Sequence, residues 1–249
     1  MSLSQMPLSQ MSLSQRSIFK KDPTVEESQE RSGHSVLPSD VYKGTIKQAY
    51  LTFVKGQNGT NINLNWKLDL EVNGNTQERT FSNIFIAKLV NGQAVYYSEK
   101  DGKRTEYPAF GALRRALDTL IGKSVFDEGV LTEKTLPVYN FQSQKEEPTP
   151  VHSIDDVLGM GAAFGIMENH ENGYKDPSQV VKRNSIERVW KLVDGQPFNA
   201  EEIKANLTEP ANCIAWKDSW AGKVNDRNLD KTKLNGGTSS KGTKALSIG

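Results

Sequence analysis

Apolar and polar residues alternate along the chain from Asn61 to Val72. Every second position is apolar, and these positions are Ile62, Leu64, Trp66, Leu68, Leu70 and Val72. Because successive side chains of a strand point to opposite faces, the pattern predicts a β-strand with one buried and one solvated face. Trp66 shares the apolar phase with aliphatic residues on both sides, so we assign its ring to the hydrophobic core.

Dipeptides that favour tight turns divide this region into further strands. They are Asn58-Gly59, Asn73-Gly74, Asn91-Gly92 and Asp101-Gly102. Each can adopt the positive φ angles of a two-residue hairpin turn, so residues 41–107 are predicted to form an antiparallel meander. Its main strands are predicted at residues 41–55, 61–72 and 77–90.

A further hairpin is predicted across Asp101-Gly102, pairing residues 94–100 with residues 103–107. Its cross-strand pairs are favourable ones: Glu99 with Arg104, and Tyr96 with Tyr107. Several residues of this hairpin could close over an extended polyanion, and they are Tyr97, Lys100, Lys103 and Arg104. An ordinary solvated turn is the alternative interpretation.

Signals for helix ends predict three helices. Pro108 begins the first helix and Gly122 follows its end. Its apolar stripe consists of Phe110, Leu113, Leu117, Leu120 and Ile121. Asn199 and Glu202 have the spacing of a capping box, which predicts a second helix. A third helix is predicted at residues 208–222.

The remaining segments complete the order of elements. Residues 146–150 are predicted to be a proline-containing loop, and residues 153–158 one helical turn. Two further strands, at residues 160–168 and 179–193, enclose a polar loop at 169–178. Three strands, a helix and two strands follow the order of an OB-fold, a small Greek-key barrel. We therefore predict a mainly β protein with a few helices, arranged as an OB-fold-like five-stranded barrel with an inserted hairpin and C-terminal helices.

Composition limits both the folded region and its chemistry. Residues 1–15 repeat one pentapeptide, so we predict a low-complexity, disordered arm at 1–35, an elaborated OB-fold at 36–223 and a disordered basic tail at 224–249.

There are 31 basic and 30 acidic residues, so the distribution of charge has to indicate a partner. The single cysteine, Cys213, excludes an intrachain disulfide and suits a reducing cytoplasm. No apolar run reaches membrane-spanning length, and we predict no membrane partner and no cofactor.

Cations and aromatic rings share faces on the predicted strands. This combination suits a single-stranded nucleic acid, because cations neutralise phosphates and rings stack on bases. The candidates are Lys43, Lys47, Phe53 and Lys55 on the first strand, and Arg79, Phe81, Phe85 and Lys88 on the third. Near and on the last strand they are Lys175, Lys182, Arg183, Arg188 and Trp190. A solvated or half-buried strand face is the alternative for each set, and core packing competes at Phe81 and Phe85.

The remaining polar residues do not form an arrangement typical of an enzyme. The glycines of residues 159–165 have the spacing GxGxxxG and lack the strand–turn–helix context of a dinucleotide site. Four residues could ligate a metal, and they are Glu168, His170, Glu171 and Asp176. The histidines of the chain have no ligand-like spacing, so a polar loop explains these carboxylates better.

Residues 30–51, 137–151 and 172–203 resemble the single-stranded DNA-binding proteins of tailed bacteriophages, in stretches such as SGHSVLPSDVYKGTIKQAYL and NGYKDPSQVVKRNSIERVWKL. The resemblance implies an OB-fold and a non-enzymatic protein that coats and protects single strands in DNA replication, recombination and repair. It also implies that the protein acts in the cytoplasm of an infected bacterial host. Phage polymerase, helicase or primase would be its partners, and a homodimer is possible. Many such proteins end in an acidic tail that recruits partners, whereas this tail is basic and could add DNA contacts.

Two other functions stay open. A strand-annealing or recombination mediator would bind duplex product or accelerate annealing, and it would require the tail. A metal-dependent nuclease would use the carboxylates between Glu168 and Asp176. Magnesium-dependent cleavage of DNA would distinguish the nuclease from both binding proteins.

Overall fold

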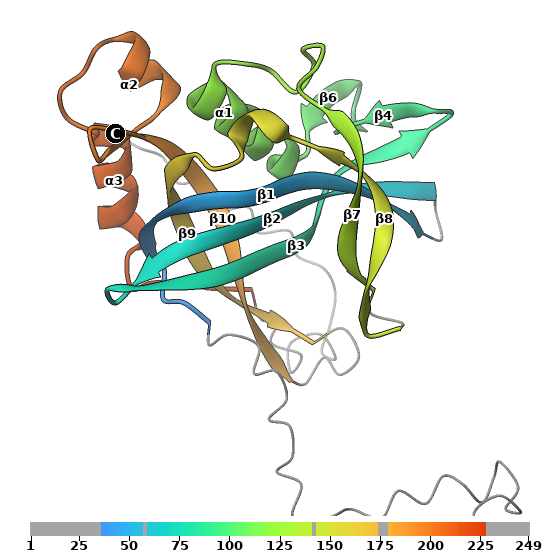
Figure 1. Ribbon diagram of the computed structural model, residues 1–249, viewed down its shortest axis with the longest axis horizontal. Helices are drawn as coiled ribbons and strands as arrows, with labels where there is room; N and C mark the ends of the chain where they lie inside the picture. The colour runs from blue at the N-terminus through green and yellow to red at the C-terminus, as the bar shows by residue number, and fades with distance from the viewer. Residues whose placement is uncertain (1–35, 57–58, 141–142, 174–178, 228–249) are drawn as a thin grey trace, which may run out of the picture. The chain divides into compact units, whose positions relative to one another are not determined.

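A computed structural model describes residues 36–56, 59–140, 143–173 and 179–227. Strands dominate these residues, and most join one sheet in the order β11-β10-β9-β1-β2-β3-β4 (Figure 1). The strands on this path are β1 (Asp40–Gly56), β2 (Gly59–Val72), β3 (Asn75–Val90), β4 (Gln93–Val95), β9 (Gly161–Asn172), β10 (Val180–Val193) and β11 (Gln196–Phe198). The predicted mainly β architecture with a few helices is confirmed.

The meander of β1, β2 and β3 is confirmed, and so are two of its turns, whereas Asn58 of the first predicted turn lies outside the described residues. Asn73 and Gly74 join β2 to β3 with φ angles of +52° and +77°. Asn91 and Gly92 join β3 to β4 with φ angles of +48° and +79°. Asn and Gly adopt this left-handed region more readily than other residues, so these turns follow directly from the sequence.

The predicted hairpin across Asp101-Gly102 forms a separate two-stranded sheet of β5 (Tyr97–Lys100) and β6 (Lys103–Glu106). Its register is as predicted, with Glu99 opposite Arg104. The single strand predicted at 94–100 is instead divided between β4 and β5 at Tyr96. The Tyr96 ring stacks on Phe110, with ring centroids 4.3 Å apart, which directs the chain from the edge of β3 toward the following helix.

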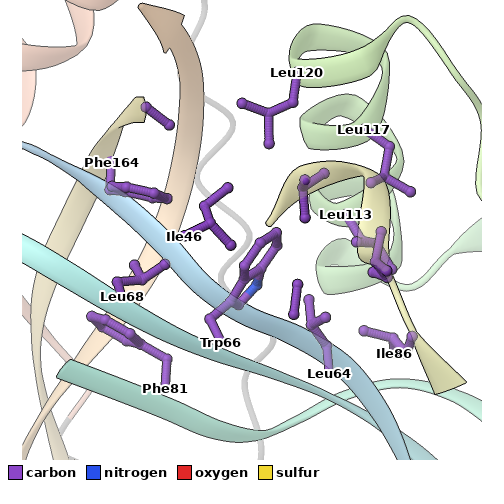
Figure 2. Packing of buried hydrophobic residues seen from close by; sticks show 14 of the residues in the cluster. Ile46, Leu64, Trp66, Leu68, Phe81, Ile86, Leu113, Leu117, Leu120 and Phe164 are labelled. Carbon is purple, nitrogen blue, oxygen red and sulfur yellow. The ribbon is translucent and has the colours of Figure 1, made fainter. Parts of the chain in front are cut away.

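That helix, α1 (Pro108–Ile121), has the predicted ends and buries the predicted stripe except Ile121, which is half-buried. Gly122 takes a left-handed φ of +67°, and its N–H donates to the Asp118 carbonyl at 3.0 Å. The helix packs against β3 and β10 and covers the first hydrophobic core. Figure 2 shows the Trp66 ring between the sheet and α1, and Trp66 is 3% exposed, which confirms its assignment to the core.

Two strands that the sequence did not predict follow α1. β7 (Thr132–Asn140) and β8 (Lys145–Ser153) form a hairpin that Figure 1 shows crossing the β1 ribbon. The prolines of this region suggested a loop at 146–150, but Pro137 and Pro148 lie opposite each other in the hairpin. Proline lacks an N–H and is tolerated where a strand has few hydrogen-bonded neighbours. The helical turn predicted at 153–158 is confirmed by the 3-10 helix η3 (Asp155–Val157).

A second, smaller hydrophobic core lies where the last helix packs against β9 and β10. α2 (Ala200–Lys204) has the predicted capping box, since the Glu202 N–H donates to Asn199 Oδ1 at 2.8 Å and the Asn199 N–H donates to Glu202 Oε2 at 2.9 Å. α3 (Ala211–Trp220) lies within the third predicted helix. The second core consists of Ala163, Met167, Trp190, Cys213 and Trp216. Burial raises the pKa of the Cys213 thiol to about 11, and the nearby Glu202 carboxylate adds to this rise.

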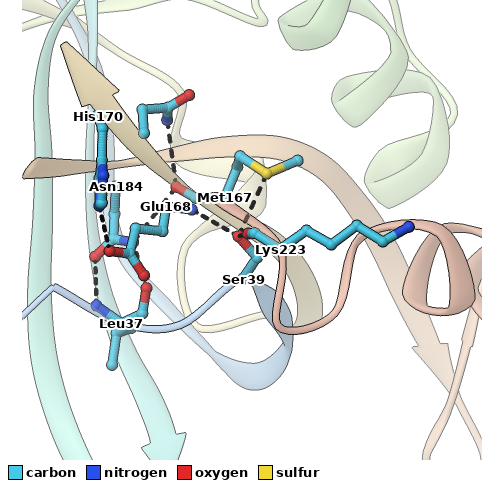
Figure 3. A network of polar contacts seen from close by, with 8 residues as sticks. Leu37, Ser39, Met167, Glu168, His170, Asn184 and Lys223 are labelled. Atoms are coloured by element: carbon cyan, nitrogen blue, oxygen red, sulfur yellow. Dashed lines mark hydrogen bonds and ion pairs between the residues drawn. The ribbon is translucent and has the colours of Figure 1, made fainter. Parts of the chain in front are cut away.

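The last described strand lies beside the point where the described fold begins. β12 (Val224–Asp226) pairs in parallel with β9, so the folded part extends three residues past the predicted boundary at Lys223, and residues 228–249 of the predicted tail lie outside the described residues. In Figure 3, Ser39 donates to the Lys223 carbonyl and accepts from the Glu168 N–H at 2.8 Å. Asn184 of β10 holds the Leu37 backbone through two hydrogen bonds of 2.8 Å.

The large sheet is not closed into a barrel by strand pairing. Its path ends at β11 on one side and β4 on the other, and no ladder between β3 and β10 is present in the described strands. The helix α1 packs against both β3 and β10, and these two strands also approach each other directly.

None of the helices in the described part of the chain is both long and apolar enough to cross a membrane.

Candidate nucleic-acid interface

A β-bulge changes the phase of the first predicted binding strand. Ile46 pairs with Leu68 and Gln48 with Lys67, so Lys47 is an extra residue in β1. We call the sheet face that carries Trp66 the core face and the opposite one the outer face. Because a bulge re-aims the residues that follow it, Lys43 lies on the outer face while Phe53 lies on the core face, and the predicted shared face is wrong.

A second bulge divides the stripe predicted on the last strand. Ile186 pairs with Ile166 and Arg188 with Gly165, which leaves Glu187 as the extra residue of β10. Lys182 and Asn184 therefore lie on one face of β10, and Arg188 and Trp190 on the other. The prediction that these residues share one face is wrong for the same physical reason as in β1.

Three of the predicted contact residues are buried. Trp190 is 1% exposed, packs edge to face with Trp216 at 5.8 Å and donates its Nε1–H to Asn212 Oδ1 at 2.9 Å. Phe81 lies on the core face opposite Trp66, and the Arg79 guanidinium donates to Gln77 at 2.7 Å. Burial lowers the pKa of Arg79. The rings of Trp190 and Phe81 are therefore core residues and not stacking platforms, which corrects the prediction at both positions.

Four of the predicted residues gather at one end of the meander, and four more lie on the adjoining β5–β6 hairpin, next to which Tyr107 contacts Phe85. We call this region the far end: residues 52–56 of β1, 59–63 of β2 and 85–90 of β3, together with β4, β5 and β6. The register aligns Lys55 with Thr60, Thr60 with Leu89, and Lys88 with Val95. The predicted residues located here are Phe53, Lys55, Phe85, Lys88, Tyr97, Lys100, Lys103 and Arg104.

Most cations of the far end have no carboxylate partner among the residues that the structure describes. Arg104 pairs with Glu99 at 3.0 Å and lies 4.9 Å from the centre of the Tyr97 ring. Four lysines make no ion pair within 4.0 Å in the described part of the chain, and they are Lys55, Lys88, Lys100 and Lys103. Lys100 and Lys103 lie directly opposite each other at the hairpin tip, so their like charges are concentrated there. This end can neutralise an anion at little cost in lost ion pairs.

Aromatic rings are exposed beside these lysines. The Phe53 ring is 41% exposed and packs edge to face against His152 of β8 at 5.1 Å. Phe126, in the loop after α1, is 59% exposed and lies 5.2 Å from Tyr96. Phe85 is half-buried and contacts Tyr107. Sequence reasoning missed Phe126 and His152 because neither lies in a periodic apolar pattern, and only a three-dimensional contact relates them to the far end.

A ladder of buried polar side chains supports the outer face next to the far end. Asn65 donates to Thr52 Oγ1 at 3.0 Å, and its Oδ1 accepts the Asn83 N–H at 3.0 Å. These bonds join β1, β2 and β3 where β3 departs from regular pairing at Asn83, whose φ is +59°. Burial raises the pKa of the neighbouring Tyr50, and the Glu146 carboxylate of the β7–β8 hairpin raises it further. The ladder fixes the strand ends from which Phe85 and Lys88 project.

The other predicted residues lie away from the far end. Lys47 pairs with Asp69 at 3.2 Å, and the Lys43 ammonium donates to the Gly195 carbonyl at 2.8 Å. Lys182 and Arg183 are exposed on β10. Lys175 lies outside the described residues.

The suggested metal ligands are engaged with other side chains. Glu168 contacts His170 at 2.7 Å, and Glu171 lies 3.7 Å from Arg227. Asp176 lies outside the described residues, and within them no group of three or more His, Cys, Asp or Glu residues could hold a metal ion.

Comparisons of this chain with protein-family models, with curated proteins and with solved structures gave no match.

Proposed function

We propose that this protein binds single-stranded nucleic acid, and single-stranded DNA in particular, through the far end of its sheet. The observation that carries the proposal is that exposed aromatic rings, and lysines without ion pairs among the described residues, are found on one end of the sheet and its adjoining β5–β6 hairpin. Single-strand binders combine a positively charged track for the backbone with rings on which bases stack, and this combination does not select a sequence.

Each group has a distinct role in this proposal. Lys55, Lys88, Lys100 and Lys103 neutralise phosphates. Phe53 and Phe126 present ring surface to the bases, and such stacking contributes about 1–3 kcal/mol per base. Arg104 is held by Glu99 and Tyr97, so it orients the hairpin more than it adds charge.

The connectivity supports an OB-fold-like origin for the sheet. β1, β2 and β3 form a meander, α1 follows β3 and its adjoining hairpin, and the later strands pair as β1 with β9 and β9 with β10. An OB-fold has this order of pairing and places a helix at the same point of the chain. We infer an open variant in which β3 and β10 approach each other without the hydrogen-bonded ladder that would close the barrel.

The wider biological assignment rests on the sequence resemblance alone. On that basis we propose protection of single strands in phage DNA replication, recombination and repair, in the cytoplasm of the bacterial host, with phage replication proteins as partners.

A titration with fluorescent oligo-dT tests the proposal. The full chain is titrated at two salt concentrations against the single strand and against a duplex of equal length. We expect preferential binding of the single strand, and log K that falls linearly with log salt at about −0.7 per neutralised phosphate. Equal affinity for the duplex, or an affinity insensitive to salt, would refute it.

A further inference from the structure

Three pairs of asparagine followed by glycine lie in the described part of the chain, and they differ in how firmly their backbone is held. They are Asn73-Gly74, Asn91-Gly92 and Asn172-Gly173. Asn58 and Asn235 also precede glycine and lie outside the described residues. Because glycine has no side chain to shield its backbone nitrogen, the amide of the preceding asparagine can react with that nitrogen.

In this reaction the asparagine side chain closes a ring with the backbone. The glycine nitrogen gives its proton to a base and bonds to the side-chain carbonyl carbon, and the side-chain nitrogen leaves as ammonia. Water then adds to one of the two carbonyl groups of the cyclic imide, the ring C–N bond at that carbonyl breaks, and the nitrogen regains a proton. The product is aspartate or isoaspartate, so a carboxylate replaces a neutral amide.

The Asn172-Gly173 pair is the most firmly held of the three. Asn172 ends β9 and lies opposite Val180 of β10. The Gly173 N–H donates to the Gln179 carbonyl at 2.9 Å. The attacking nitrogen is therefore engaged in a hydrogen bond, and the sheet fixes the backbone of the asparagine.

The Asn73-Gly74 turn is exposed, but its central peptide group is anchored. Asn75 Nδ2 donates to the Asn73 carbonyl at 3.3 Å, and this carbonyl belongs to the same peptide group as the Gly74 nitrogen. The turn joins β2 to β3, which pair along most of their length. Ring closure requires the Asn73 backbone to rotate out of its left-handed conformation, with φ at +52°, and this anchoring opposes the rotation.

The Asn91-Gly92 turn has neither kind of protection. It joins β3 to β4, which has 3 residues and lies at the end of the sheet path. Among the described residues no backbone carbonyl accepts the Gly92 N–H, and no side chain bonds to the Asn91 carbonyl. Both residues are exposed, and a Cβ added to Gly92 would meet no atom within 4 Å. A short strand at the end of a sheet opens more readily than a long paired one, so this turn leaves its left-handed conformation most often.

We propose that Asn91 is a site of spontaneous deamidation, and that its conversion weakens the binding of nucleic acid at the far end. The three environments predict that Asn91 reacts fastest, Asn73 more slowly and Asn172 most slowly.

The modification would place a negative charge among the lysines of the far end. Residue 91 directly follows β3, and Lys88 near the end of that strand lies opposite Val95 of β4. A carboxylate here repels the phosphates that Lys88 is proposed to neutralise. Isoaspartate also adds one atom to the backbone of a two-residue turn, which disturbs the register of the β3–β4 hairpin. This consequence rests on the function proposed for the far end, whereas the modification itself does not.

Ageing of the full chain in mildly alkaline buffer made with oxygen-18 water tests the modification. Base removes the proton of the glycine nitrogen, and water supplies an oxygen of the new carboxylate, so the product carries the label. Mass spectrometry of peptides from one digest compares the three pairs in the same sample. We expect labelled product at Asn91 several-fold faster than at Asn73, and slowest at Asn172. Equal rates at the three pairs, or a faster reaction at Asn73 than at Asn91, would overturn the proposal.

Two variants test the assigned cause. Asn75→Ala removes the bond to the Asn73 carbonyl, so it should speed the reaction at Asn73 and leave that at Asn91 unchanged. Asn91→Gly removes the reacting amide and tolerates the left-handed conformation, so it should abolish the product at this turn and keep the hairpin. An unchanged rate at Asn73 in the first variant would contradict the protection assigned to Asn75.

Titration with oligo-dT measures the consequence for binding. The aged chain should bind several-fold more weakly than fresh protein, with a salt slope shallower by up to about 0.7, the contribution of one phosphate. Equally aged Asn91→Gly should keep the affinity of fresh protein. An equal loss of affinity in both would trace the loss to another site and overturn the effect assigned to Asn91. If fresh protein does not bind oligo-dT, the function proposed for the far end is wrong, and the rates at the three pairs still decide the modification.

Discussion

The two ends of the β1–β2–β3 meander are made of the same strands and differ in how their charges are used. At the near end, which comprises β1 up to Lys47 and the facing parts of β2 and β3, Lys47 pairs with Asp69 and Lys67 with Glu78. There β1 is hydrogen-bonded to β2 on one edge and β9 on the other. At the far end the lysines lack carboxylate partners within the described ranges, and past Leu51 the pairing described for β1 is with β2 alone. One end of a sheet can thus supply stability while the other retains groups for a ligand.

Gly44→Ala should produce the largest effect, at the near end. A Cβ at Gly44 would lie 2.3 Å from the Asp69 carbonyl oxygen and 2.8 Å from Leu70 Cδ2, so the backbone of β2 would have to shift. Such overpacking should lower the free energy of unfolding by about 3 kcal/mol or more. Urea denaturation measures this loss.

The matched control is Gly161→Ala on the neighbouring strand. Its added Cβ would have Leu192 Cδ1 at 3.7 Å as its contact, an ordinary van der Waals distance. Equal denaturation midpoints for Gly44→Ala and Gly161→Ala would show that the near end is less tightly packed than its distances indicate.

Phe53→Ala should affect the far end and not the stability. The ring is 41% exposed, so its loss should remove a stacking surface worth about 1–3 kcal/mol of binding to oligo-dT, with little change in thermal stability. Fluorescence titration and a thermal melt on the same sample provide both measurements. Val54→Ala removes a similarly exposed side chain, 43%, from the outer face and serves as control. Equal affinities of the two variants for oligo-dT would show that Phe53 does not contact the nucleic acid.

Lys100→Gln combined with Lys103→Gln should reduce the salt dependence of binding. If both lysines neutralise phosphates, the slope of log K against log salt should become shallower by about 1.4. The hairpin should keep its register, because the Glu99–Arg104 pair and the Asp101-Gly102 turn are unchanged. An unaltered slope would mean that the hairpin tip does not contact the strand.

Lys47→Gln combined with Lys67→Gln should have the smallest effect, although it removes the same charge. Partly exposed ion pairs contribute about 0–1 kcal/mol each, so the loss of stability should be slight. We expect the salt slope for oligo-dT to stay close to that of the unchanged protein. A slope change equal to that of the hairpin variant would erase the distinction between the two ends.

Local signals in the sequence predicted much of this fold. The Asn-Gly and Asp-Gly turns set the hairpin registers, Pro108 and Gly122 set the ends of α1, and the Asn199 capping box is present as expected. Each of these is decided within a few residues, by backbone conformation or by a side chain bonding to its own helix. Trp66 was also correctly assigned, because β2 keeps its apolar side chains on one face, although Asn63 and Asn65 on the other face are buried as well.

The predicted binding faces failed where the strands are irregular. One extra residue in β1 and one in β10 exchange the faces of everything that follows, and no residue type near Lys47 or Glu187 marks a bulge. The burial of Trp190 depends on α3, which is distant in sequence and provides Trp216. The β7–β8 hairpin was missed because its prolines argue against strands locally, whereas Ser153 and His152 join it to β1. These features result from long-range packing, which a periodicity argument does not include.

The single thiol of the chain lies in the second core. Its rate of chemical modification therefore measures how often this core opens. Cys213 is 5% exposed, and with a pKa of about 11 it is almost wholly protonated at neutral pH. Since the thiolate is the reactive form, a thiol reagent should modify the native protein only as fast as α3 separates from β9 and β10. The rate of that reaction can be followed with and without bound oligo-dT. The ratio of the two rates would measure how much a ligand at the far end changes the opening of the second core.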